Sequence, residues 1–199
     1  MNYSDFAILY RMNVQSRAIE DILMRESIPY KIIGGLKFYE RKEIKDIIAY
    51  LRLISNQSDN LALTRIINEP KRGIGGVSLN KIEELAIENE TSMYNIIKQS
   101  EKFIPRIQGN VVDFVEMVEV LKDADLTITE LVKMILIKSG YMASLQAENT
   151  VESETRIQNL EEFLTVVSEF EEEYAENGLD EFLQNLSLSS DVDNIDDSD

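Results

Sequence analysis

The most specific chemical signal in the sequence is a glycine-rich segment between two predicted helices, Pro70-Lys71-Arg72-Gly73-Ile74-Gly75-Gly76-Val77-Ser78. Glycines permit positive φ, so consecutive N–H groups can converge on one phosphate, helped by the positive end of a following helix that we expect to begin at Ser78. Lys71 and Arg72 would add two cations, and such a site would hold a sugar–phosphate backbone without reading its sequence. Alternatively, the glycines only permit a tight turn and the cations are solvated. The residues alone favour neither interpretation.

A second candidate site lies in the segment Tyr10-Arg11-Met12-Asn13-Val14-Gln15-Ser16-Arg17, which follows a predicted strand and enters a predicted helix. Open α/β folds bind ligands at such a place, where Arg11 and Asn13 could each contact a phosphate. The alternative makes Asn13 the N-cap of the helix and Arg11 an ordinary surface cation. The segment taken by itself favours this second interpretation.

Two further groups of residues have simpler explanations. Residues 34–46 mix aromatic side chains with cations, which can support stacking of nucleic-acid bases, but the pattern also describes a packed turn followed by solvated helix charges such as Arg41 and Glu43. The carboxylates at 161–162 and 171–173 could form a metal or acid–base site. They fall mostly on the polar face of one predicted helix, so an exposed charged surface is the favoured explanation.

The residue types also restrict catalysis. The chain has no Cys and no His, which excludes disulfides, thiolate nucleophiles, His-based relays and Cys- or His-ligated metals. None of the eight glycines precedes a Lys-Ser or Lys-Thr pair at the spacing of a phosphate-binding loop of ATPases, and Gly73–Gly76 lacks the third glycine of a dinucleotide fingerprint. We therefore expect no complete nucleotide site.

Charge divides the chain in two. The 199 residues include 37 acidic and 20 basic side chains, a formal net charge of −17. Residues 1–110 sum to +2 and residues 111–199 to −19. Phosphate binding depends on Lys and Arg, so only the first part is a credible partner for nucleic acid. No apolar run is long enough for a membrane span, and the N-terminus does not resemble a signal peptide, so we expect a soluble cytoplasmic protein.

Apolar patterning predicts a mainly α fold that begins with a partial α/β unit. The runs at 5–10 and 30–33 favour two short buried strands. These alternate with predicted helices at 14–25 and 40–55, which gives a βαβα unit. Two strands cannot cover both faces of a parallel sheet, so this unit is interpreted as part of a larger domain.

The remainder predicts a helical domain. Asp59 and Ser78 are suited to cap helices, and Thr127 with Glu130 predicts a capping box. The longest helix is expected at 152–176, where apolar residues recur every three or four positions. Residues 189–199, rich in Asp and Ser, predict an acidic linker or tail.

The candidate segments form an ordered set of motifs: Ala7-Ile8-Leu9-Tyr10-Arg11-x-Asn13-x-Gln15-Ser16-Arg17, Gly34-Gly35-x-Lys37-Phe38-Tyr39-Glu40-Arg41-Lys42-Glu43-Ile44-Lys45-Asp46, Arg72-Gly73-Ile74-Gly75 and Arg156-Ile157-x-Asn159-Leu160-Glu161-Glu162-Phe163. In this order and spacing they closely resemble the superfamily 1 DNA helicases of the PcrA/UvrD type. The resemblance covers essentially the whole chain.

The resemblance implies that the chain is a fragment of an ATP-dependent 3′-to-5′ DNA helicase that serves repair or replication. Residues 1–50 would be part of the RecA-like motor domain 2A, residues 51–188 the inserted helical subdomain 2B, and residues 189–199 an acidic tail. The family's ATP-binding loop and acidic Mg²⁺ motif do not occur in this sequence. The fragment would therefore have no catalytic residue, metal site or cofactor of its own, whereas the parent protein would use ATP and Mg²⁺.

The resemblance also assigns roles to particular residues. Arg11 and Asn13 would contact single-stranded DNA, although Met12 stands where the family commonly has Thr. Amides of the glycine hairpin would hold the duplex backbone, and Lys71, also at a common Thr position, adds a cation. The complete set of expected duplex-binding residues is Lys71, Arg72, Gly73, Ile74, Gly75 and Gly76.

The expected partners follow from these roles. They are duplex and single-stranded DNA, the missing motor domains, regulatory proteins that bind the helical subdomain and, through exposed strand edges, other copies of the chain; no membrane is expected. An alternative is an acidic helical protein-interaction module at 111–199 with little DNA binding of its own. A third interpretation, a carboxylate-metal enzyme, requires a divalent ion near Glu161 or Glu173.

Overall fold

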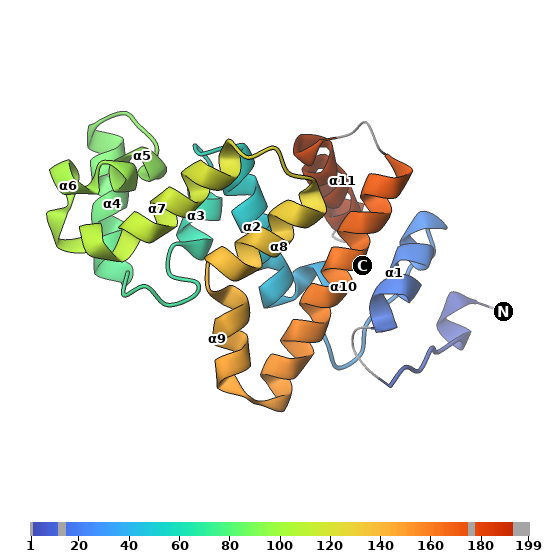
Figure 1. Ribbon diagram of the computed structural model, residues 1–199. Helices are drawn as coiled ribbons and strands as arrows, with labels where there is room; N and C mark the ends of the chain where they lie inside the picture. Colours follow the sequence, from blue (N-terminus) through green and yellow to red (C-terminus); the bar gives the residue numbers. More distant parts are fainter. Residues whose placement is uncertain (1, 12–14, 175–177, 193–199) are drawn as a thin grey trace. The chain divides into compact units, whose positions relative to one another are not determined.

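The computed structural model describes residues 2–11, 15–174 and 178–192, and in these ranges the chain is mainly α-helical (Figure 1). Contacts divide the chain into two compact units, one of residues 1–45 with 149–199 and the other of residues 46–148. We call them the terminal unit and the central unit. Among the described helices, none has the length and apolarity that crossing a membrane requires.

The terminal unit is built mainly from helices. They are η1 (Tyr3–Asp5), α1 (Ser16–Arg25), η3 (Phe38–Glu40), the first residues of α2 (Lys42–Ser55), α10 (Val151–Glu173) and α11 (Leu179–Val192). An aromatic cluster joins the last two: Phe182 of α11 lies 5.0 Å from Phe170 and 6.2 Å from Phe163 of α10, measured between ring centroids. These three rings give α10 and α11 a shared core.

The predicted βαβα unit is wrong. No strand or sheet occurs among the described residues; residues 6–10 and 30–33 carry no regular secondary structure apart from a bend that begins at Ile33. An apolar run becomes a buried strand only where another strand pairs with its backbone and other elements cover its faces. Here Leu9 is 94% exposed and Ile33 is 82% exposed. The strand edges through which we expected self-association are therefore also missing from the described residues.

The central unit is entirely helical in its regular elements. It contains the rest of α2, α3 (Asn60–Ile66), α4 (Gly76–Glu88), α5 (Met93–Lys98), α6 (Ser100–Phe103), η4 (Pro105–Ile107), α7 (Gln108–Lys122), α8 (Ile128–Lys138) and α9 (Tyr141–Glu148). Helix α5 packs against α3, α4 and α7, while α8 packs against α7 and α9. Their core includes the fully buried side chains Tyr50, Leu63, Ile66, Tyr94, Val118, Val132 and Ile135.

Two of the predicted helix caps are confirmed and one is wrong. The Asp59 side chain accepts a hydrogen bond from the Ala62 N–H at 2.9 Å, and Thr127 forms a capping box with Glu130. Ser78 does not cap α4, because the helix already begins at Gly76, and its N-cap is the extended residue Gly75, three residues before Ser78.

The contact-based units do not coincide with the predicted 1–50, 51–188 and 189–199 division, because α10 and α11 group with the N-terminal residues. Contact grouping and family subdivision are different criteria, so the predicted subdivision stays a prediction.

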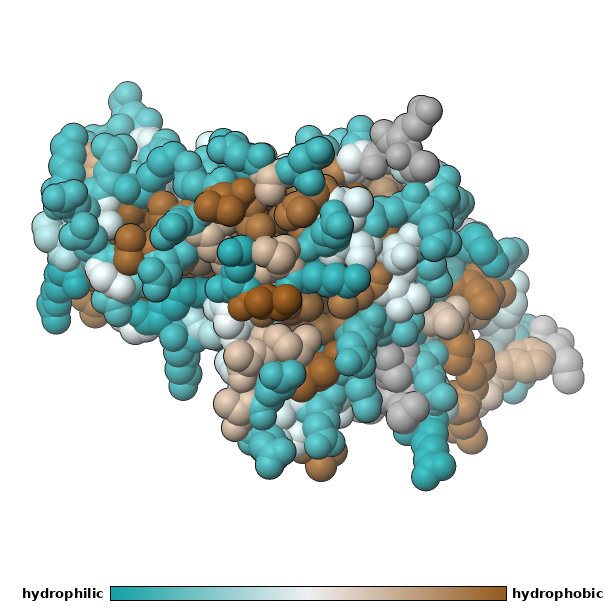
Figure 2. All heavy atoms as spheres, viewed as in Figure 1, coloured by the Kyte–Doolittle hydropathy of each residue, from teal (hydrophilic) through white to brown (hydrophobic). Residues whose placement is uncertain are grey.

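On the face drawn in Figure 2 the surface is mostly hydrophilic, with apolar side chains between the polar ones. In the central unit, the strongly exposed apolar residues include Leu61, Val77 and Ile137.

Candidate nucleic-acid interface

The glycine-rich segment forms the connection between α3 and α4 in the central unit. Asn68 fixes its shape, because Oδ1 of this side chain accepts hydrogen bonds from the N–H groups of Arg72 (2.8 Å) and Ile74 (3.1 Å). The Ile74 side chain is buried, and Gly73 has a φ of +75°, which favours glycine. The segment therefore has a defined shape before any ligand arrives. We call residues 70–78 the hairpin.

The guanidinium group of Arg72 is directed into the protein. Its Nη1 donates to the carbonyl oxygens of Ile66 (3.0 Å), Ile67 (3.3 Å) and Pro70 (3.2 Å). Its Nη2 donates to the Tyr50 hydroxyl at 2.8 Å and, at a longer 3.4 Å, to the Ser139 carbonyl. These are the contacts of a cation with internal partners, in contrast to the solvated cation that one interpretation of the sequence proposed.

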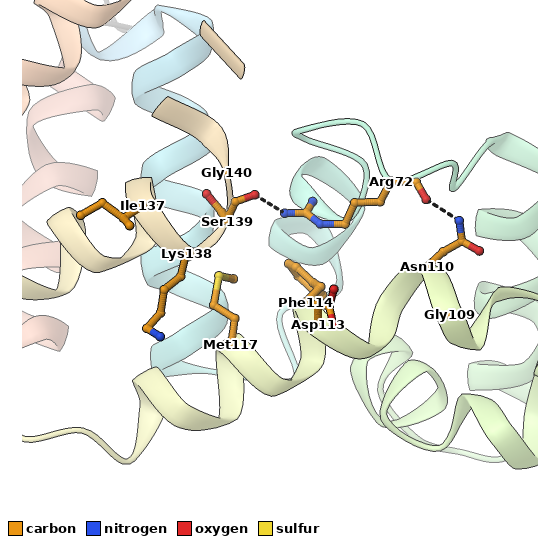
Figure 3. Close-up of a pocket in the computed structure, with 10 residues that line it drawn as sticks. All are labelled: Arg72, Gly109, Asn110, Asp113, Phe114, Met117, Ile137, Lys138, Ser139 and Gly140. Carbon is orange, nitrogen blue, oxygen red and sulfur yellow. Dashed lines mark hydrogen bonds between the residues drawn. The ribbon is translucent and has the colours of Figure 1, made fainter. Parts of the chain in front are cut away.

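One aromatic ring and one side-chain amide complete the surroundings of Arg72. The guanidinium lies over the Phe114 ring, 4.9 Å from its centroid, and the Asn110 side chain donates to the Arg72 carbonyl at 2.7 Å. Figure 3 shows the hydrogen bond from the Arg72 side chain to Ser139 and the hydrogen bond from the Asn110 side chain to the Arg72 backbone. A cavity of about 390 Å³ adjoins this arrangement and includes Met117 and Lys138 in its lining.

In contrast to the Arg72 side chain, the backbone that follows Arg72 is exposed to solvent. Gly73, Gly75 and Gly76 are exposed, and a Cβ added at Gly75 or Gly76 would meet no atom within 4 Å. Helix α4 has no side-chain cap. In the described residues, the N–H groups of its first turn, from Gly76 to Ser78, find no protein acceptor.

Unpaired N–H groups at a helix N-terminus carry partial positive charge and are arranged to bind an oxyanion. Lys71 is exposed and belongs to the same hairpin, so the segment presents one cation to solvent. Of the six residues predicted to bind the duplex, Lys71 and the three glycines present accessible groups. The Ile74 side chain is buried, and the Arg72 guanidinium donates to acceptors inside the protein.

The predicted single-strand site can be described only in part. Arg11 is exposed, and its backbone N–H donates to Oε1 of Gln15 at 3.1 Å. Asn13, like Met12, lies outside the described residues. Arg11 belongs to the terminal unit and the hairpin to the central unit, so each site is described by itself.

The third candidate segment contains a buried polar network that the sequence did not reveal. Arg41 and Glu43 were interpreted as solvated charges, but both are buried. Arg41 donates to Oδ1 of Asn159 and to the Ser16 hydroxyl, both at 2.8 Å, and the Asn159 amide donates to Glu43. Burial lowers the pKa of Arg41. The only sequence signal was that Asn159 and Arg41 both belong to motifs of the same family.

The carboxylates of α10 serve in part as ion-pair partners. Arg17 of α1 contacts Glu162 at 3.0 Å and Glu169 at 2.5 Å on α10, and Asp21 on its own helix at 2.7 Å. Glu172 and Glu173 are exposed. Across the ranges that the structure describes, no group of three or more Asp or Glu side chains is placed to hold a metal ion.

Comparison with known proteins gives one consistent result. The model of the UvrD-like helicase C-terminal domain matches residues 1–198. The ATP-dependent DNA helicase PcrA of Staphylococcus aureus is 42% identical over 201 residues, and that of Staphylococcus epidermidis is 44% identical over the same length. Each match covers 98% of this chain but 27% of the relative, so the chain spans about a quarter of the length of these proteins.

Proposed function

The chain belongs to the UvrD-like helicase C-terminal domain family, and from this premise we propose that it is a DNA-contacting regulatory part of an ATP-dependent 3′-to-5′ DNA helicase. In this proposal, the hairpin binds the backbone of duplex DNA without sequence preference. The parent protein unwinds DNA in the cytoplasm during repair or replication. The family's division into part of motor domain 2A and the inserted subdomain 2B belongs to the same proposal.

The observation that carries the proposal is the row of exposed, unpaired N–H groups at the start of α4. Phosphate oxygens are strong acceptors, and the positive end of a helix favours their charge. Gly75 and Gly76 have no side chains that would keep a phosphate away from these amides, and the space beside them is open. Backbone amides cannot distinguish bases, so binding through them is independent of sequence.

Lys71 supplies the charge-dependent part of the proposed binding. Fluorescence anisotropy with a labelled duplex at low salt tests this role by comparing the unmodified chain with Lys71→Ala. Lys133→Ala is the matched control, because it removes an exposed lysine from α8 in the same unit. We expect weak binding, with a dissociation constant of roughly 10⁻⁴ M, that Lys71→Ala weakens and Lys133→Ala leaves unchanged. Equal effects of the two substitutions would contradict a specific contact at the hairpin.

Contact with single-stranded DNA is a separate part of the proposal. The exposed Arg11 side chain would pair with a phosphate of the single strand, and Asn13 would assist it. Anisotropy with a labelled oligonucleotide should show weaker binding for Arg11→Ala, with Lys133→Ala again as the control. An unchanged affinity would remove Arg11 from the site.

ATP chemistry is assigned to other parts of the parent. The relatives are named as ATP-dependent helicases, and most of their length lies outside the matched region. We propose that this chain alone neither hydrolyses ATP nor unwinds DNA, and that ATP and Mg²⁺ bind elsewhere in the parent. Phosphate release from ATP in the presence of Mg²⁺ and DNA tests this point. Turnover by the purified 199-residue chain above that of a buffer blank would contradict it.

The acidic surface of α10 supports the alternative of a protein-interaction module. Glu172 and Glu173 are exposed next to one another near the end of the helix. A basic partner that bound there should lose affinity when the run at 171–173 is changed to glutamine, with DNA binding unaffected. Binding of a lysine-rich peptide, measured by calorimetry, distinguishes the two: retention after the substitutions would exclude this surface.

A further inference from the structure

Arg72 is one of the residues expected to bind the duplex backbone, and the hydrogen bonds of its guanidinium group are made to acceptors inside the protein. We infer that Arg72 is a positioning residue, which fastens the hairpin to the helices around it and thereby holds the α4 amides in a phosphate-binding arrangement. The structural half of this inference stands on the contacts alone. Its consequence for DNA binding rests on the proposed function.

Three of the carbonyl acceptors of Arg72 lie at the ends of two helices. Ile66 is the last residue of α3 and Ile67 is its C-cap, while Ser139 is the C-cap of α8. Carbonyl groups at helix C-termini lack intrahelical partners and carry partial negative charge. The guanidinium of Arg72 donates to the carbonyls of both helix ends, so its positive charge compensates their partial negative charge.

The remaining contacts close the arrangement on its other sides. Tyr50 of α2 is fully buried; its hydroxyl accepts from Arg72 and donates to the Glu69 carbonyl, at the beginning of the segment that leads into the hairpin. Phe114 of α7 lies against the guanidinium plane. One side chain thus joins the hairpin to α2, α3, α7 and α8.

Lysine cannot replace arginine in such an arrangement. An ammonium group has the same charge, but it lacks the planar fork that donates in several directions and packs on a ring. If Arg72 bound phosphate mainly through its charge, Arg72→Lys would keep most of the DNA affinity. If Arg72 positions the hairpin, Arg72→Lys should behave like Arg72→Ala.

The first measurement uses no DNA. Amide hydrogen exchange, followed by NMR on the 199-residue chain, reports the N–H groups of Arg72 and Ile74, both of which donate to Asn68. We expect both amides to exchange at least about tenfold faster in Arg72→Lys, the effect of losing one hydrogen bond to a charged group. Lys71→Ala should leave both rates unchanged. Unchanged rates in Arg72→Lys would overturn the inference.

A second variant keeps the test informative if Arg72→Lys does not fold. Tyr50→Phe keeps the buried ring and removes only the hydroxyl that accepts from Arg72, so it should also speed exchange at Arg72 and Ile74. Melting curves identify any variant that is globally unfolded. If Tyr50→Phe folds and exchange at both amides stays slow, the bond between Arg72 and Tyr50 does not hold the hairpin in place, which contradicts the inference.

DNA binding then separates the two proposals. In duplex anisotropy over a range of salt, Arg72→Lys and Tyr50→Phe should each weaken binding about tenfold, although neither variant removes a positive charge. Faster exchange with unchanged DNA affinity would leave Arg72 as a positioning residue of the hairpin but reject the hairpin as the DNA site. Slow exchange in Arg72→Lys together with lost affinity would overturn the inference, because the hairpin would keep its shape while the planar guanidinium fork, and not its charge alone, acted on the DNA.

Discussion

The properties of single residues decide what the hairpin can bind. Gly75 is extended, with φ −86° and ψ 176°, a conformation that any residue adopts, and its surroundings are open. Its lack of a side chain is therefore not needed for folding. The same absence matters for a ligand, because a methyl group at this position would stand where a phosphate must approach the α4 amides.

Gly75→Ala should consequently weaken duplex binding with only a small effect on stability. We expect the free energy of unfolding to fall by about 0.5–1 kcal/mol, because Gly is preferred over Ala at an N-cap, and the affinity to fall about tenfold or more, the effect of one charge-assisted hydrogen bond. Denaturant melts and anisotropy on the same samples measure both. Full retention of affinity would show that phosphate does not approach Gly75.

Gly73→Ala provides the contrasting case. Its positive φ strains any residue with a side chain, and the added Cβ would lie 3.0 Å from Nδ2 of Asn110. We expect the free energy of unfolding to fall by about 1–2 kcal/mol. A variant as stable as the unmodified chain in denaturant melts would show that the hairpin can relax at this position.

Glu119 gives the central unit a specific response to acid. Lys98 donates to this carboxylate and holds its pKa below the usual range, and the hydroxyl of Tyr94 and the amide of Gln57 also donate to it. Because the pKa is lower in the folded state, the stabilisation is complete above the unfolded pKa of about 4.3 and disappears as the pH falls through the folded pKa.

Glu119→Gln removes this contribution. At pH 7 we expect the variant to be less stable by about 1 kcal/mol, because one ion pair and part of the hydrogen bonding are lost. The difference from the unmodified chain should shrink below about pH 4.3. Urea melts at several pH values measure it, and a difference that stayed constant down to pH 3 would exclude Glu119 as the responsible group.

At the scale of helices, α11 depends on a small set of contacts. Phe182 is 1% exposed and packs against two aromatic rings of α10. Phe182→Ala should lower the free energy of unfolding of the terminal unit by about 3–5 kcal/mol. Amide exchange throughout α11 should become faster. Unchanged protection in α11 would show that other contacts hold this helix.

Helix positions were the most predictable part of the fold, because their signals are local. Asp59 and Thr127 cap helices through bonds that span three residues, and both were recognised from the sequence. Strands depend on distant pairing, which an apolar run such as 5–10 cannot reveal. This segment was predicted to be a strand, but it has no regular structure between Phe6 and Tyr10.

The same distinction explains the outcome at the candidate site. The glycines and cations identified the hairpin from local residue types. The direction of Arg72 was not predictable, because two of its partners, Tyr50 and Ser139, are 22 and 67 residues away in the sequence. Arg41 depends similarly on Asn159, 118 residues away. A lone sequence shows that a charge is present but not which distant group it contacts.

At the scale of the whole molecule, the net charge of −17 opposes nucleic-acid binding, and local chemistry must overcome it. In the hairpin, Arg72 is occupied by internal acceptors, which leaves Lys71 as the accessible cation. Each phosphate that a cation neutralises contributes a slope of roughly −0.9 to the dependence of log affinity on log salt.

The slope for duplex binding should therefore be about −1, and close to zero in Lys71→Ala. Anisotropy titrations at several salt concentrations measure it. A slope of −2 or steeper that persists in Lys71→Ala would show that DNA binds a different, more basic surface.

The central claim, that the hairpin holds the DNA backbone, is tested most directly by NMR. Unlabelled duplex is titrated into the ¹⁵N-labelled chain, and the shift of each amide signal is followed. The account predicts the largest changes at Gly73, Gly75, Gly76 and Val77, independent of the DNA sequence. Shifts confined to other elements, such as α10 and α11, or no shifts at millimolar duplex, would contradict it.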